Sequence, residues 1–97
     1  MAEVTVVARI KALPTRKEAV RQVLISLMQP TRSEPGCVSY DLHVAADDET
    51  LFMIHEKWKS GRDLNEHLQK PYIKAFVEKT GELLAEPVEI SLWEKIA

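Results

Sequence analysis

His67 is the side chain in this sequence best suited to accept a proton from a small molecule. Histidine changes charge between pH 5 and 8, so a neutral imidazole can act as a general base near physiological pH. A helix beginning near Ser60 would place His67 on one stripe with Leu64 and Leu68, which is an apolar setting for a polar ring. Such a histidine either takes part in a reaction or packs against its neighbours and tethers the helix, and the sequence alone leaves both interpretations open.

The strand predicted before that helix carries a second acid–base group, Glu56. The apolar run over residues 51–58 places alternate side chains on one face of the strand, and that face carries Phe52, Ile54, Glu56 and Trp58. A carboxylate buried there without a partner would cost stability and have a raised pKa. We expect Glu56 to orient His67, to act as the base itself, or to form an ion pair such as one with Arg62.

Aromatic side chains could form the flat walls of a pocket for an aromatic ligand, and tyrosine hydroxyls add hydrogen-bonding groups. Trp58 follows Glu56 on the same strand face and is the third candidate for the catalytic group. The candidates for substrate binding are Tyr40, Phe52, Tyr72 and Phe76. Aromatic residues at such spacings also occur in ordinary cores, so each of them has both interpretations.

Several other chemistries lack the residues that they need. His43 and His55, with Asp41 nearby, fall on neighbouring strands, but no close histidine or cysteine spacing completes a metal site. We expect no metal there and a hydrogen-bonding role at an interface. The three glycines form no phosphate loop or dinucleotide fingerprint, so we expect no built-in flavin or nicotinamide cofactor. The single Cys37 allows no intramolecular disulfide.

The composition, 45% hydrophobic and 29% charged residues, is ordinary for a soluble globular protein. The net charge is −2, which gives no electrostatic footprint for nucleic acid or for an anionic membrane. No apolar run approaches the roughly 20 residues that span a bilayer. The first residues show no basic segment followed by an apolar one, and the lone cysteine fits a reducing compartment. We therefore expect a cytoplasmic protein.

Hydrophobic periodicity predicts elements in the order β-α-β-β-α-β. The first helix is expected to begin with a capping box at Thr15 and Glu18 and to end between residues 30 and 33. Ser60 is the expected N-cap of the second helical region, and Pro71 is expected to open its next helix. The strands fall at residues 3–12, 37–44, 51–58 and 88–95.

This order is the split βαβ, ferredoxin-like α+β pattern, which predicts one domain over residues 1–97. The four strands would form an antiparallel sheet with the helices on one face. The opposite face would carry Val7, Met53 and Trp93, which makes it too apolar to remain in contact with water. We expect a second copy of the chain to cover it in a two-fold homodimer.

A set of motifs closely resembles the antibiotic biosynthesis monooxygenase family, and most nearly its small members that are similar to quinol monooxygenases. The motifs follow the family's order and spacing on the predicted frame: Glu34-Pro35-Gly36-Cys37 with Tyr40, then Phe52, then Glu56 with Trp58, then His67-Leu68 with Pro71-Tyr72 and Phe76.

The resemblance implies a dimeric α+β barrel, in which two sheets pack face to face, and a pocket between sheet and helices. It also implies oxidation of electron-rich aromatic or quinol substrates by O₂ without a bound flavin, haem or metal. The family's strand-end aromatic position falls on Trp58, its acidic partner on Glu56 and its helix histidine on His67. Relatives that degrade haem use an asparagine of the first strand, which this chain lacks, since Asn65 is its only asparagine.

We expect a cofactor-independent monooxygenase that oxidises a small hydroquinone or polyphenol. His67 would take the proton, and Glu56 would orient His67 or balance its charge. The aromatic residues would hold the substrate ring. One alternative is an isomerase or lyase that uses the same base without O₂. Another is a non-enzymatic protein that binds a hydrophobic metabolite or haem.

Overall fold

The computed structural model describes residues 3–97. Its strands are β1 (Val4–Lys11), β2 (Cys37–Ala45), β3 (Asp48–Trp58) and β4 (Glu89–Trp93). A short 3₁₀ turn, η1 (Pro14–Arg16), leads into α1 (Lys17–Ser26) and α2 (Met28–Arg32), which lie between β1 and β2. Two helices, α3 (Gly61–Leu68) and α4 (Pro71–Leu83), lie between β3 and β4.

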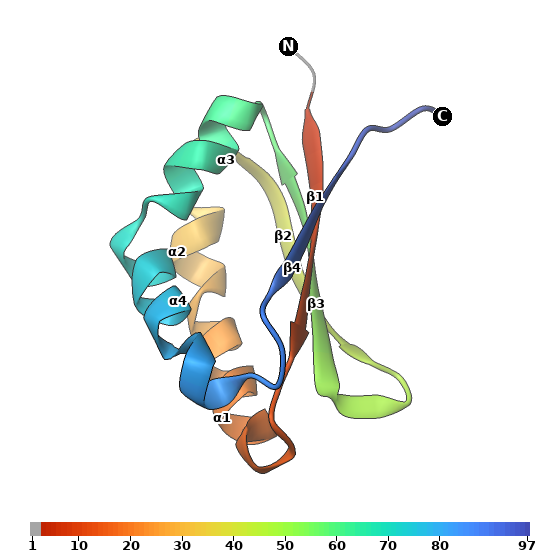
Figure 1. Ribbon diagram of the computed structural model, residues 1–97. Coiled ribbons are helices and arrows are strands. Elements are labelled where there is room, and N and C mark those ends of the chain that lie inside the picture. Colours follow the sequence, from red (N-terminus) through yellow and green to blue (C-terminus); the bar gives the residue numbers. More distant parts are fainter. Residues whose placement is uncertain (1–2) are drawn as a thin grey trace.

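The four strands form one antiparallel sheet in the order β2-β3-β1-β4. Figure 1 shows all of the helices on one side of this sheet, with the opposite side uncovered. Both observations confirm the predicted ferredoxin-like α+β fold. Within residues 3–97, no helix is both long enough and apolar enough to cross a membrane.

The core lies between the sheet and the helices because the buried alternate residues of β1 and β3 that face the helices are apolar, apart from Glu56. On α1 the buried residues are Val20 and Leu24, four apart and therefore on one helical face. The largest side chains with almost no exposure are Trp58, Phe52, Ile10 and Leu24. Glu56 lies on the same buried face of β3 as Phe52 and Trp58, as the alternation predicts.

Two of the predicted helix starts are confirmed and one is wrong. Ser60 is the N-cap of α3, where its hydroxyl accepts a hydrogen bond from the Asp63 backbone N–H at 3.2 Å, and Pro71 opens α4. The capping box predicted at Thr15 and Glu18 is wrong, because Thr15 lies inside η1 and no side chain caps α1.

The first helical region is divided at Leu27 into α1 and α2, whereas the sequence suggested one helix. Pro30 explains the break. Proline has no backbone N–H, so it cannot bond to the carbonyl of Ser26, the last residue of α1. The second segment ends at Arg32, within the predicted limits.

The uncovered sheet face carries the residues that the alternation placed there. Cross-strand partners share a face, and the register gives three rows of side chains across β4, β1, β3 and β2. The rows are Trp93-Thr5-Lys57-Ser39, Ser91-Val7-His55-Asp41 and Glu89-Arg9-Met53-His43.

Gly36 is closely surrounded, which gives a test of how the start of β2 packs on α3. No glycine within residues 3–97 has a positive φ, so backbone conformation does not require glycine here. A Cβ at this position would overlap Cβ and Cγ of Asp63, the residue that bonds to the N-cap Ser60.

We predict that Gly36→Ala lowers the free energy of unfolding by about 1–3 kcal/mol, the usual cost of overpacking. Gly81→Ala is the matched control. Its Cβ would meet nothing within 4 Å, and alanine at this position in α4 should stabilise the helix by about 0.5–1 kcal/mol. Urea denaturation of both variants measures the two effects. Equal stability changes would contradict the packing that we describe.

Candidate active site

His67 is held on the buried face of α3 by two aromatic rings. Its side chain is 3% exposed. The Trp58 ring lies with its centroid 4.5 Å away and tilted by 35°, and the Tyr40 ring lies edge-on at 5.6 Å and 66°. The stripe of α3 that carries Leu64 and His67 is buried, as the spacing predicts, whereas Leu68 is partly exposed at its edge.

The hydrogen-bond partner of His67 is Glu34, not Glu56 as the sequence suggested. Nδ1 of His67 lies 2.8 Å from Oε2 of Glu34, and the Tyr72 hydroxyl donates a hydrogen bond to the same oxygen. That hydroxyl also lies 3.3 Å from the Pro30 carbonyl oxygen. Glu34, His67 and Tyr72 therefore form one connected group, which joins the turn before β2 to α3 and α4.

Sequence reasoning missed Glu34 as a site residue. The residue was visible as the first member of the Glu34-Pro35-Gly36-Cys37 turn, where a carboxylate is ordinarily solvated. In the fold it is 8% exposed. Within residues 3–97, the four buried polar side chains are Thr31, Glu34, Glu56 and His67, and three of them belong to this region.

Glu56 has a different hydrogen-bond partner, Trp58. Its Oε1 accepts a hydrogen bond from Nε1 of Trp58 at 2.9 Å. The ion pair suggested with Arg62 is wrong, since Arg62 lies 3.5 Å from Glu66 on the exposed side of α3. Burial raises the pKa of Glu56 from 4.5 to about 7; the Trp58 hydrogen bond opposes this shift, and the nearby charge of Glu34 adds to it. Near neutral pH this carboxyl can therefore exist in both protonation states.

A cavity of about 100 Å³ lies between the sheet and the helices, next to these groups. Its polar lining residues are Tyr40, Glu56 and His67, and every other lining side chain is apolar. Burial raises the pKa of Tyr40 above its usual range, so this hydroxyl keeps its proton and can donate a hydrogen bond. The cavity thus offers a few ionisable or hydroxyl groups on an apolar wall.

The predicted site residues divide into two groups. His67, Glu56, Tyr40 and Phe76 line the cavity. Trp58, Phe52 and Tyr72 do not line it. Trp58 lies against His67 and is fully buried, Phe52 is part of the core, and Tyr72 reaches Glu34 instead.

The two histidines of β2 and β3 lie on the opposite face of the sheet from this arrangement. His43 pairs with Met53 and His55 pairs with Asp41, both on the uncovered face. No group of three or more potential metal-ligating side chains occurs within the described residues, 3–97.

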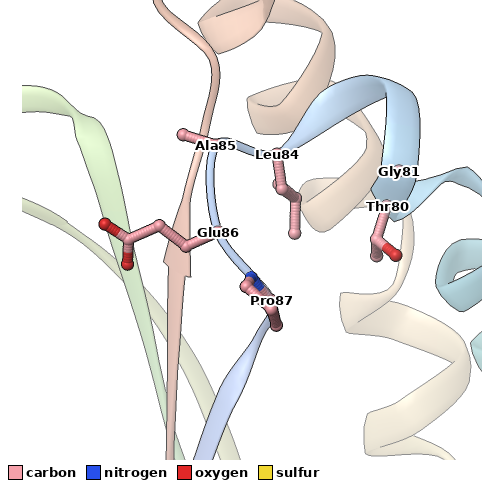
Figure 2. A pocket seen from close by; sticks show the side chains of 6 residues that line it. All are labelled: Thr80, Gly81, Leu84, Ala85, Glu86 and Pro87. Carbon is pink, nitrogen blue, oxygen red and sulfur yellow. The ribbon is translucent and has the colours of Figure 1, made fainter.

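A larger, open hollow of about 290 Å³ lies between the end of α4 and the segment that leads to β4 (Figure 2). Its lining residues are Thr80, Gly81, Leu84, Ala85, Glu86 and Pro87. Glu86 is the one ionisable group among them, and it pairs with Arg9 at 2.9 Å. This hollow therefore lacks the acid–base groups that the smaller cavity has.

Comparison with known proteins agrees with this description. The sequence profile described as "Antibiotic biosynthesis monooxygenase" matches residues 3–79. A protein of Mycobacterium tuberculosis, Rv0793, provisionally named a monooxygenase, is 37% identical over 89 residues, which cover 92% of this chain and 87% of that protein. An uncharacterised protein of Synechocystis is 36% identical over 91 residues, but the chain spans only 62% of its length.

Solved structures show the same fold. The crystal structure of PA3566 from Pseudomonas aeruginosa superposes with a TM-score of 0.94 at 32% identity and covers 100% of this chain and 97% of that one. The structure of Rv0793 gives a TM-score of 0.93 at 33% identity, over 99% and 97% of the two chains. With a profile match over residues 3–79 and relatives more than 30% identical along nearly the whole chain, this protein belongs to the antibiotic biosynthesis monooxygenase family.

Proposed function

We propose that this protein is a monooxygenase that oxidises a small, electron-rich phenol or hydroquinone with O₂ and without a built-in cofactor. The observation that carries the proposal is the apolar cavity that has two acid–base side chains, His67 and Glu56, in its wall. An apolar wall suits a neutral ring, and the two groups suit removal and return of protons.

The substrate itself supplies the electrons that reduce O₂. A hydroquinone and one O₂ give a hydroxyquinone and one water. One oxygen atom forms a new bond to a ring carbon, and the other leaves as water with two hydrogens from the substrate. His67 would remove a phenolic proton first, because a phenolate gives up an electron to O₂ more readily than a phenol does. General base catalysis of this kind typically contributes ~10²–10⁴-fold.

The size and charge of the cavity favour a single neutral ring. A benzene molecule occupies a protein cavity of about 150 Å³, and this cavity is about 100 Å³. A one-ring substrate therefore fits with small movements of the rim, where Leu68, Val77 and Ile90 are 37%, 58% and 53% exposed. No lysine or arginine lines the cavity, so it offers no counter-charge for the carboxylates of haem.

Oxygen uptake tests the proposed reaction. We predict that chemically reduced one-ring quinones and polyphenols give uptake above protein-free autoxidation, and that His67→Ala lowers this excess at least ~100-fold. Glu66→Gln is the control, because Glu66 lies on the exposed side of α3, next to His67 in the sequence, and should leave uptake unchanged.

Excess uptake that is equal in wild type and His67→Ala would keep the enzyme and remove His67 as its base. Uptake at the autoxidation rate for every substrate would reject the monooxygenase. Conversion of a substrate that persists without O₂ would instead favour the isomerase or lyase alternative, which uses the same base.

The raised pKa of Glu56 predicts how stability depends on pH. Because its pKa is about 7 in the folded protein and its ordinary value is 4.5, the folded state holds this proton more tightly. Stability therefore falls as pH rises from about 4.5 to about 7, by an amount on the order of 3 kcal/mol.

Glu56→Gln keeps an acceptor for Trp58 and removes the titration. We expect its stability relative to wild type to increase by roughly 2–3 kcal/mol between pH 5 and pH 8 in urea denaturation. Glu66→Gln, at an exposed position of α3, is the control and should run parallel to wild type. If the stability of Glu56→Gln changed with pH in the same way as that of wild type, the pKa of Glu56 in the folded protein would be ordinary.

We also propose that two copies of the chain pack through the uncovered sheet face. Support comes from Val7 and Met53, which lie half-buried at its centre, and from Trp93, which is 58% exposed on its edge strand. Exposed apolar area of this kind is typical of an interface between subunits.

A charge at the centre of that face should separate the subunits. We predict that Met53→Glu converts a dimer, with about twice the 11.0 kDa chain mass, into a monomer in light scattering after gel filtration. Lys74→Glu, on an exposed position of α4, should leave the mass unchanged. A wild-type monomer, or a dimer that survives Met53→Glu, would contradict the proposed interface.

A further inference from the structure

The geometry points to Glu34 as the positioning residue of the proposed base: its carboxylate fixes the proton of His67 on Nδ1 and leaves Nε2 free for the substrate. This inference rests on the proposed function only for the role of His67. The hydrogen bond itself, and the protonation of the ring, can be tested without any substrate.

The direction of the hydrogen bond follows from the chemistry of its partners. An ionised carboxylate only accepts hydrogen bonds, so Nδ1 of His67 is the donor across the 2.8 Å contact when Glu34 is ionised. The Tyr72 hydroxyl donates to the same oxygen of Glu34. Burial and the neighbouring carboxylate raise the pKa of Tyr72 above its usual range, so this donor keeps its proton. The Oε2 atom of Glu34 thus already serves as an acceptor for one donor.

The other ring nitrogen, Nε2, has no hydrogen-bond partner in the described part of the chain. Nε2 of His67 makes no hydrogen bond within residues 3–97 and is not among the fully enclosed unpaired atoms of that part of the chain. His67 lines the cavity, whereas Glu34 does not. With Nδ1 bonded behind the ring, the lone pair on Nε2 is the proton acceptor that remains for a ligand.

The ring and the carboxylate are both held in place. Trp58 and Tyr40 pack against two sides of the His67 ring, and Trp58 is itself bonded to Glu56. Glu34 is fixed by its backbone: its N–H donates to the Thr31 carbonyl oxygen and its carbonyl oxygen accepts from Cys37 N–H, each at 3.0 Å. A buried, fixed carboxylate also stabilises the imidazolium that forms when Nε2 takes a proton.

The decisive measurement is the protonation of His67 in ¹⁵N-labelled protein at pH 8, read from long-range ¹H–¹⁵N correlations. We expect a proton on Nδ1 and a bare Nε2 in wild type. Glu34→Gln removes the charge and can present an N–H to Nδ1, so we expect the Nε2–H form to appear. We also expect kcat/KM to fall at least ~10-fold with little change in KM.

Two further variants separate positioning from packing. Tyr72→Phe leaves the carboxylate on Nδ1, so the ring should keep its Nδ1 proton. Glu66→Gln, next to His67 on the exposed side of α3, should change neither the spectrum nor the rate.

A wild-type ring that carries its proton on Nε2, or on both nitrogens at pH 8, overturns the inference. So does a Glu34→Gln variant with an unchanged tautomer and full activity. If Glu34→Gln does not fold, the wild-type and Tyr72→Phe spectra still decide which nitrogen is protonated. Absence of any oxygenase activity would reject the proposed function and leave the spectroscopic result standing, so the two failures are distinguishable.

Discussion

The hydrogen bond between Glu34 and His67 is the contact on which the arrangement of this site depends. It joins residues 33 apart in the sequence, and both side chains are almost fully buried. A buried carboxylate is tolerated only when it is paired, and removal of one partner would leave the other uncompensated. This pairing holds the turn before β2 against helix α3, and Tyr72 adds helix α4. The three segments must keep their relative positions for these buried hydrogen bonds to persist.

The two buried glutamates differ in their hydrogen-bond partners and in their surroundings. Glu34 lies 2.8 Å from Nδ1 of an imidazole and accepts a hydrogen bond from a hydroxyl. Glu56 has one indole N–H for a partner and lies in an apolar wall, so its proton is retained to higher pH. The site consequently places one carboxyl against the histidine, outside the cavity, and a second, titrating carboxyl in the cavity wall.

Most of the fold could be predicted because it follows from local patterns. Alternation identified the strands and their faces, and Ser60 and Pro71 marked helix starts for reasons of capping and of a missing N–H. The partner of His67 could not be predicted in this way, because a turn residue far away in the sequence supplies it. The break at Leu27 was also missed, although Pro30 carried its signal. Thr15 and Glu18 matched a capping pattern, but the chain enters α1 through a 3₁₀ turn instead.

The sheet order has a consequence for how the chain is made. Strand β4 pairs only with β1, and the Ser91 side chain bonds to the carbonyl of Val7, 84 residues earlier. Closing so long a loop is slow, and until β4 has been synthesised one edge of β1 has no neighbour. A nascent chain therefore exposes a row of open backbone groups beside apolar side chains. That interval is when pairing with another chain, and hence aggregation, competes most strongly with folding.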